Sequence, residues 1–424
     1  MSRLSRSQAR RPLVWAAALG FAFGGITRPV AAQEHRAFAD PDGVQIRFGM
    51  QRPPSPGFAQ LYMFQGAPDA EGPQTGLIVD KSGNLFGTTD IGGAFGYGAV
   101  YEVVKNGASW KERVVFGFSG SDGMSPEGTP TIDKDGNIYV TSIEGAAFGN
   151  GSIVKLSPAS GGYTETAVYS FVGPEGSSPS AGLLPRGKDF YMTTTSGGAY
   201  GLGSIVLVTP SLQVTDVYDF GTSAYDGSDA NSNLIADSTG ALYGTTSNGG
   251  DYGLGTVFRF VPSKRGQGKL ETLYSFHGGS DGATPLQGVI RDDQGALYGV
   301  TTAGGDENGD GVVFKLTPSG NYYEETILHR FSESSDGFNP VGALTFKGRV
   351  IFGTAANGGS QGGGTIFQIS DFGTGYATVW NFEQDGSPGA LPRCQLVSKG
   401  AALYGTTSSN VGSVALGTVF EYTP

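Results

Sequence analysis

Short apolar runs rich in β-branched and aromatic residues recur along this chain, and glycine, proline or aspartate bounds almost every run. The runs are about four to seven residues long and none shows helical periodicity, so the pattern predicts β-strands. One phrase, LYGTT or a close variant, returns in steps of 53, 52, 52, 55, 54 and 52 residues, with its aromatic residue at Phe86, Tyr139, Tyr191, Tyr243, Tyr298, Phe352 and Tyr404. A fixed period of about 50 residues indicates a repeat architecture.

Each repeat carries three further landmarks. One is a glycine that opens an apolar run, found at Gly98, Gly151, Gly203, Gly255, Gly311, Gly364 and Gly417. Another is a phenylalanine that closes an aromatic strand, found at Phe64, Phe118, Phe171, Phe220, Phe276, Phe331 and Phe382. The third is an apolar run before the LYGTT phrase, joined to it by an Asp- and Gly-containing turn that suits a tight hairpin. The repeat therefore predicts four strands: a (before the phrase), b (the phrase), c (opened by glycine) and d (closed by phenylalanine).

The predicted strands are nearly free of charge on both faces, and strand b holds small residues where large ones would be expected. Such strands suit sheets that are packed face to face on both sides. We therefore predict an all-β fold, a seven-bladed β-propeller of four-stranded antiparallel blades, with an open solenoid as the alternative. The repeats begin with a lone strand d at residues 61–64 and end after strands a, b and c. A closed ring would pair residues 61–64 with residues 418–422.

The first 32 residues predict an export signal. Four arginines precede an apolar stretch at residues 13–26, and the small residues Val30 and Ala32 form a cleavage-like site. Pro12 makes a twin-arginine signal a poor match, so ordinary secretion to the periplasm or the cell exterior is favoured. We expect residues 1–32 to be a signal peptide, residues 33–57 a flexible lead-in and residues 58–424 the propeller.

Charge and composition narrow the functions. Loss of the signal removes five arginines and no acid, so the formal charge falls from −11 to −16, which disfavours binding to nucleic acid. No later stretch has the roughly 18 apolar residues that would span a bilayer, so no transmembrane anchor is predicted. The single cysteine, Cys394, allows no intramolecular disulfide. We expect a monomer that is stabilised by packing alone.

These repeats resemble the GloVer tandem repeat of exported bacterial proteins, whose consensus is similar to LYGTT, GG, GTVFKL, LYSF and a DG loop. The resemblance covers nearly all of residues 62–422, and Leu242 to Phe258 is a specific match. The strand logic is also similar to that of kelch propellers, although the kelch Tyr and Trp pattern is absent. The GloVer resemblance implies an exported repeat protein with varied anchors and no established biochemical activity.

Two loops of each repeat are long and polar: the d–a loop, which joins strand d of one blade to strand a of the next, and the b–c loop within a blade. Both should lie at the same end of the ring, and we expect any ligand to bind there. Each d–a loop carries an acid followed by glycine, at Glu71, Asp122, Glu175, Asp226, Asp281, Asp336 and Asp385. These acids could form a cation ring or contain a glycosidase acid and base pair. Their recurrence in every blade favours a third interpretation, in which each acid caps the amides of its own loop.

The b–c loops differ between blades. At one loop position, the first four blades carry the aromatic residues Phe95, Phe148, Tyr200 and Tyr252. The last three blades carry Asn308, Gln361 and Val414 at this position. An arc of exposed rings could stack on sugars, because a ring face accepts the C–H face of a pyranose. The alternative is that these rings pack against loop glycines.

Two weaker constellations remain. Residues 306–311 copy the opening of a calcium loop, with Asp306, Asn308 and Asp310 as ligands, but the late carboxylate is replaced by Thr317. Calcium stays an alternative and no other cofactor is predicted. His329 replaces the aromatic residue of strand d and precedes Arg330, which indicates either a local ligand site or a tolerated exchange on an outer strand.

No nucleophile elbow, zinc protease, P-loop or dinucleotide motif is present, and Cys394 has no histidine near it in sequence. The sequence therefore favours a non-catalytic exported propeller that binds a carbohydrate or an envelope component, such as an envelope protein, through the d–a/b–c face. A polysaccharide lyase or glycoside hydrolase on the same scaffold is one alternative, supported by fold analogy alone. A structural module for protein contacts is the other.

Overall fold

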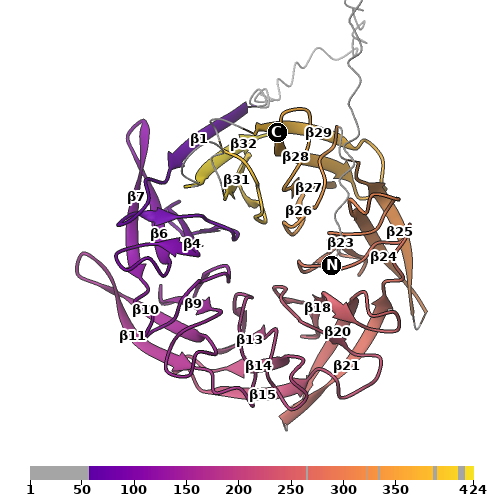
Figure 1. Cartoon of the computed structure of the whole chain (residues 1–424), viewed down its shortest axis with the longest axis horizontal. Coiled ribbons are helices and arrows are strands. Elements are labelled where there is room, and N and C mark those ends of the chain that lie inside the picture. Colours follow the sequence, from indigo (N-terminus) through magenta and orange to yellow (C-terminus); the bar gives the residue numbers. More distant parts are fainter. Residues whose placement is uncertain (1–56, 264–265, 321, 333–334, 385–388, 409–415) are drawn as a thin grey trace, which may run out of the picture. The chain divides into compact units, whose positions relative to one another are not determined.

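The computed structural model describes residues 57–263, 266–320, 322–332, 335–384, 389–408 and 416–424. The predicted signal at residues 1–32 and residues 33–56 of the predicted lead-in lie outside this part of the chain. In the described residues every element is a strand, and seven four-stranded antiparallel sheets stand around a common centre (Figure 1). The predicted all-β fold, a seven-bladed β-propeller, is confirmed.

Each blade runs from a short inner strand a to a long outer strand d. Blades 1 to 3 consist of β3 (Ile78–Val79), β4 (Leu85–Thr89), β6 (Ala99–Asn106) and β7 (Ser109–Gly117); β8 (Thr131–Ile132), β9 (Ile138–Ser142), β10 (Ser152–Ala159) and β11 (Gly162–Ser170); and β12 (Leu184–Arg186), β13 (Asp189–Thr193), β14 (Ser204–Val208) and β15 (Val214–Asp219).

The remaining blades follow the same order. Blades 4 to 6 consist of β17 (Ile235–Ala236), β18 (Leu242–Thr246), β20 (Thr256–Ser263) and β21 (Gly266–Ser275); β22 (Ile290–Arg291), β23 (Leu297–Thr301), β24 (Val312–Ser319) and β25 (Tyr322–Arg330); and β26 (Thr345–Lys347), β27 (Val350–Ala355), β28 (Gly362–Ser370) and β29 (Ala377–Glu383). Blade 7 joins both ends of the described chain: β30 (Val397–Lys399), β31 (Ala402–Thr407), β32 (Thr418–Thr423) and β1 (Gly57–Met63).

Closure of the ring follows the predicted arrangement. Strand β1 pairs antiparallel with β32, with Tyr62 opposite Val419 and Met63 opposite Thr418. In Figure 1, β1 lies beside β32 at the outer edge of the last blade. The pairing begins at Gly57, four residues before the predicted strand at residues 61–64, so the first element is longer than expected.

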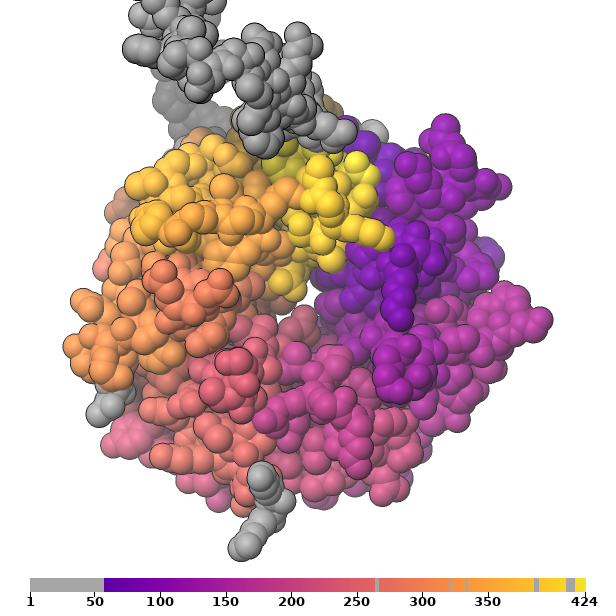
Figure 2. All heavy atoms as spheres, turned by 180° about the vertical axis from the view of Figure 1, so that it is seen from behind, coloured from indigo at the N-terminus to yellow at the C-terminus, as the bar shows by residue number. Residues whose placement is uncertain are grey.

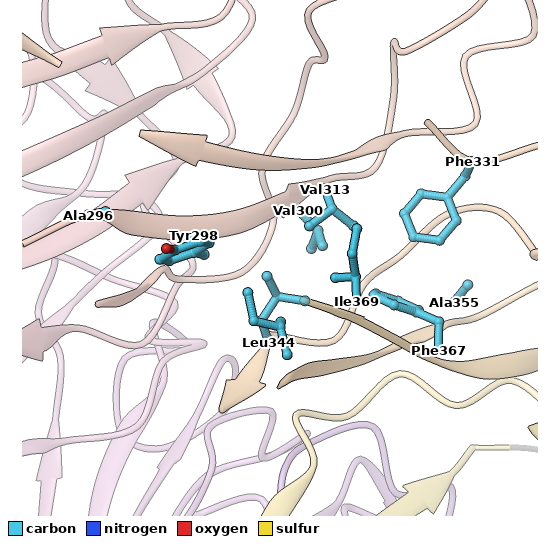
Figure 3. Close-up of a cluster of buried hydrophobic side chains, with 10 residues drawn as sticks. Ala296, Tyr298, Val300, Val313, Phe331, Leu344, Ala355, Phe367 and Ile369 are labelled. Carbon is cyan, nitrogen blue, oxygen red and sulfur yellow. The ribbon is translucent and has the colours of Figure 1, made fainter. Parts of the chain in front are cut away.

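The core lies between neighbouring blades. All residues of β4, β9, β18 and β23 are buried, so the repeated aromatic residue of strand b belongs to the scaffold. Figure 3 shows one interface, where Tyr298 and Val313 of blade 5 face Leu344 and Phe367 of blade 6. Burial of such side chains is the main favourable contribution to folding, and here it is repeated around the ring.

Glycine in strand b allows a close approach to strand c. A Cβ built on Gly244 would lie 2.7 Å from the ring of Phe258 and 2.9 Å from Leu234. The aromatic residue of strand c therefore fills the place that a side chain in strand b would occupy. The close approach at Gly244 is therefore between strands of one blade, rather than between two sheets that pack face to face.

The outer strands differ from the expectation of strands without charge on either face. Along β7, Lys111 and Arg113 are exposed and Glu112 between them is partly buried. Strand d is the edge of its blade, so one of its faces meets solvent, and charge there also discourages pairing with another chain.

The d–a and b–c loops are tied to one another at one end of the ring. Two short strand pairs join them, β2 (Ala70–Glu71) with β5 (Ile91–Gly92) and β16 (Gly227–Ser228) with β19 (Asn248–Gly249). Isolated bridges such as Ala283 with Ala303 do the same in other blades. The loops at this end of the ring are therefore held together by backbone hydrogen bonds. The space-filling view from behind shows a narrow opening at the centre of the ring (Figure 2).

Candidate functional site

The four predicted aromatic residues of the b–c loops, Phe95, Phe148, Tyr200 and Tyr252, are all exposed. Only Tyr252 lines the groove described below. Tyr200 lies over the backbone of Gly221 in its own blade, where an added Cβ would be 3.1 Å from the Tyr200 side chain. For Tyr200 this agrees with the alternative in which the ring packs on a loop glycine, although the glycine belongs to the same blade.

A groove of about 510 Å³ lies where blades 3 and 4 meet at the d–a/b–c end. Its most exposed rings are Tyr225, 65% exposed, and Tyr252, 58% exposed. Tyr225 comes from the d–a loop that follows β15, and Tyr252 from the b–c loop of blade 4. The ring of Tyr252 meets the His277 ring edge to face at 4.7 Å, which fixes one wall of the groove.

The floor of the groove is formed by strands β15 and β21. Tyr218 donates its hydroxyl to Asp226 at 2.7 Å, and Tyr274 donates its hydroxyl to Asp281 at 2.8 Å. Burial and the hydrogen bond to Asp226 raise the pKa of Tyr218, so its hydroxyl stays protonated. Thr272 donates to the carbonyl of Tyr225 at 3.1 Å, which holds the exposed tyrosine against blade 4. The groove therefore has a fixed polar floor and two open aromatic faces.

Sequence reasoning missed Tyr225. It stands one residue before the repeated acid Asp226, where the other d–a loops carry no aromatic residue. An aromatic residue in only one copy of a loop was the available signal.

The repeated acids of the d–a loops cap their own loops. Asp122 accepts from the amide of Ser119 at 2.9 Å, and Glu175 accepts from the amide of Val172 at 2.8 Å. Asp226 and Asp281 receive the same kind of bond at 2.9 and 2.6 Å. These geometries agree with the capping interpretation. Asp385 lies outside the described residues.

One assignment among these acids was wrong. In the loop between blades 7 and 1 the capping acid is Asp69, which accepts from the amide of Gln65 and the hydroxyl of Tyr62, both at 2.9 Å. Glu71, which was predicted from its following glycine, lies two residues later in β2. The acid is positioned by its distance from the proline that follows it: Asp69 lies four residues before Pro73, as Asp122 lies four residues before Pro126.

His329 occupies the place of that tyrosine in blade 5. Its Nε2 lies 2.8 Å from Oδ2 of Asp336, and its ring stacks on Tyr376 at 3.5 Å. Burial lowers the pKa of His329, against the opposing effect of Asp336. Arg330 points to the neighbouring blade, where it donates to the carbonyl of Ser280 at 3.1 Å. Both residues therefore bind to the scaffold itself.

The calcium candidate forms a turn of its own. Asp306 accepts from the amides of Asn308 and Gly309, both at 2.9 Å, and Asp310 is buried. Among the described residues, no group of three or more His, Cys, Asp and Glu side chains could hold a metal ion.

Cys394 is fully enclosed near the centre of blade 7. Its Sγ accepts from the amide of Thr406 at 3.0 Å, and burial raises the pKa of the thiol. A thiol held in this way is a packing residue rather than a nucleophile.

A larger hollow of about 1040 Å³ opens at the opposite end, between the a–b turns of blades 1, 2, 3 and 7. Its lining includes Lys81, Lys134 and Lys399 together with Asp80 and Asp133. The longer loops therefore do not mark the larger of these two hollows.

The family comparison agrees with the repeat. Residues 264–424 match the model of the Gloeobacter/Verrucomicrobia repeat. This match agrees with the resemblance seen in the sequence, and it shows that residues 264–424 carry repeats of this type. No curated protein matches its sequence. In the part of the chain that the structure describes, no helix is long and apolar enough to cross a membrane.

Solved structures with the same fold have very different sequences. The extracellular domain of a one-component system from B. thetaiotaomicron is 11% identical with a TM-score of 0.54, over 85% of this chain and 39% of that chain. The extracellular domain of a hybrid two-component system from the same organism is 11% identical with a TM-score of 0.52, over 87% and 41%. This chain thus spans less than half the length of either. A europium-containing methanol dehydrogenase is 9% identical with a TM-score of 0.51, over 87% and 93%. At such identities the likeness shows the fold alone.

Proposed function

We propose that this chain is an exported, non-catalytic propeller that binds a carbohydrate of the cell envelope or its surroundings through the d–a/b–c face. The observation that carries the proposal is the pair of exposed tyrosines, Tyr225 and Tyr252, in one groove. Aromatic faces bury much of a sugar ring at little cost in side-chain entropy. Export rests on the predicted signal at residues 1–32.

The polar groups of the groove suit sugar hydroxyls. Asp251, Ser223 and His277 line it beside the two tyrosines, so donors and acceptors surround the apolar ring faces. Its volume of about 510 Å³ falls within the range of about 300–1,000 Å³ that is typical of ligand pockets. Because the loops on both sides are tied to their neighbours, little ordering is needed on binding.

A hydrolase or lyase is the rival function. A glycoside hydrolase needs two carboxyl groups in different roles, and the groove contains Asp226 and Asp251. Asp226 already accepts hydrogen bonds from Tyr218 and from the amide of Ser223. Asp226 is therefore committed to the scaffold, which favours binding without catalysis.

The test uses the protein from residue 33 onward against a panel of neutral and acidic polysaccharides in affinity electrophoresis. Tyr225→Ala and Tyr252→Ala should each weaken binding by about tenfold, the effect of losing one well-packed aromatic contact. Tyr322→Ala is the matched control, because Tyr322 is 64% exposed and lies after a c–d turn at the other end of the ring.

Other results would contradict the proposal. Unchanged binding in the double tyrosine variant would exclude this groove. Release of reducing ends or unsaturated products would make the protein an enzyme. Failure to bind any polysaccharide would favour the structural module for protein contacts.

A further inference from the structure

One residue from each blade lines the mouth of the central channel at the d–a/b–c end. Each of these residues directly follows a proline, or Ala230 in blade 4. Together they surround a cavity of about 300 Å³. In the order of blades 1 to 7 they are Gln74, Glu127, Ser180, Asn231, Leu286, Val341 and Arg393. The landmarks of the repeat are nearly the same in all blades, whereas this position carries seven different residues. We call these residues the mouth ring.

The backbone that presents the mouth ring is the same in every blade. The residue two places earlier has a positive φ, for example 56° at Thr284 and 50° at Ser178. The amide of Thr284 donates to the carbonyl of Leu254 at 2.9 Å, and its carbonyl accepts from the amide of Thr302 at 3.2 Å. A non-glycine residue stays in this region only where its surroundings hold it. The scaffold therefore fixes each mouth-ring position, and only the side chain varies.

The mouth ring has a charged side and an apolar side. Blades 7, 1 and 2 contribute Arg393, Gln74 and Glu127, and Gln74 donates to the carboxylate of Asp90 at 2.5 Å. Blades 5 and 6, which precede blade 7 around the ring in Figure 1, contribute Leu286 and Val341.

Some polar atoms at the mouth have no hydrogen-bond partner. Within the described residues, the Oδ1 atoms of Asn231 and Asp90 are buried without a partner. The positive charge of Arg393 acts on Asp90, where it opposes the rise in the pKa of that carboxyl group that burial causes. Burial and the charges of Asp90 and Glu144 raise the pKa of Glu127. Buried polar groups without partners are costly and uncommon, and a cation beside these carboxyl groups would relieve their repulsion.

Side chains below the mouth ring narrow the channel. Asn233 accepts from the amide of Gly182 at 2.7 Å and donates to Thr129 at 3.5 Å, and Gln395 donates to the carbonyl of Leu344 at 3.0 Å. The cavity at this depth holds about 40 Å³, which is room for a few water molecules. The room for a ligand is therefore the mouth cavity itself, of about 300 Å³.

We propose that the mouth ring binds a small zwitterion with an aliphatic part, of which an aliphatic α-amino acid is the simplest. Its carboxylate would pair with Arg393, and its ammonium group would donate to Glu127 and to Oδ1 of Asn231. Its aliphatic part would lie against Leu286 and Val341. This site is separate from the tyrosine groove, so the proposal does not depend on the proposed function.

The probe is L-leucine, titrated by calorimetry into the protein from residue 33 onward. Compounds that lack one charged group, 4-methylpentanoate and 3-methylbutylamine, should bind at least about tenfold more weakly, as should leucine to Arg393→Gln and Glu127→Gln. Lys399→Gln, at the opposite end, should bind leucine as before. Melting without ligand shows that each variant is folded.

Three outcomes would overturn the proposal: no saturable binding of leucine at about 10 mM, tighter binding of glucuronate than of leucine, or unchanged leucine affinity in folded Arg393→Gln. The two proposals fail separately. Tyr252→Ala should leave leucine binding unchanged, and Arg393→Gln should leave polysaccharide binding unchanged.

Discussion

Tyr62, near the start of the described chain, lies opposite Val419, near its end, and this pair makes the first strand the outer strand of the last blade. Phe64 behind it is fully buried, and Phe58 stacks on Trp380 of blade 6 at 4.2 Å. Removal of residues 1–64 should therefore lower stability by more than about 3 kcal/mol, the cost of one lost buried phenylalanine.

The matched deletion ends before the strand. Removal of residues 1–56 keeps all of β1 and should leave the melting temperature unchanged. Thermal melting of both proteins checks this. Equal melting temperatures for the two deletions would contradict closure of the ring by β1.

Gly244 in strand b should not tolerate a side chain. In Gly244→Ala the new methyl group would overlap the ring of Phe258 at 2.7 Å, so the free energy of unfolding should fall by about 1–3 kcal/mol. Gly117→Ala is the control, because the nearest atom to its added Cβ lies at 3.4 Å, an ordinary contact distance. Denaturant unfolding of both variants is the measurement, and similar losses in both would show that close approach is not the cause.

The repeat made the scaffold predictable and the site hard to predict. Seven copies of one phrase identified the strands, and the lone strand d at the start predicted that residues 61–64 pair with residues 418–422. The same repetition concealed the groove, because only one d–a loop has an aromatic residue, Tyr225, directly before its acid. The mouth ring was missed for a related reason. Gln74 and Arg393 belong to no motif in the sequence. Seven different side chains from equivalent positions of the repeat come together around one channel only when the ring has closed.

Two partly buried glutamates should make folding depend on pH. Burial, together with the neighbouring carboxylate of Asp69, raises the pKa of Glu112 to about 9, and burial with Asp281 does the same for Glu325. A raised pKa in the folded state contributes stability below about pH 4.5, and this contribution is lost as the pH rises toward 9.

The variants Glu112→Gln and Glu325→Gln remove this titration. Each should lose less stability than the parent between pH 5 and pH 9, because the amide does not titrate. Glu383→Gln, at an exposed position of β29, should follow the parent. Melting curves at both pH values are the test. If the melting temperatures of the parent and of both variants changed equally between the two pH values, these carboxyl groups would be charged in the folded protein.

His329 should be replaceable by the tyrosine that the other blades pair with their acid, so that the new tyrosine would face Asp336. Since burial lowers the pKa of His329, the unfolded chain takes up its proton first, and stability is lost as the pH falls below about 6.5. His329→Tyr should fold and lose less stability than the parent between pH 7 and pH 5. His329→Ala, which loses the stack on Tyr376, should be less stable at both pH values. Thermal melting at pH 5 and pH 7 is the measurement, and an equal loss in the parent and His329→Tyr would mean that His329 titrates normally.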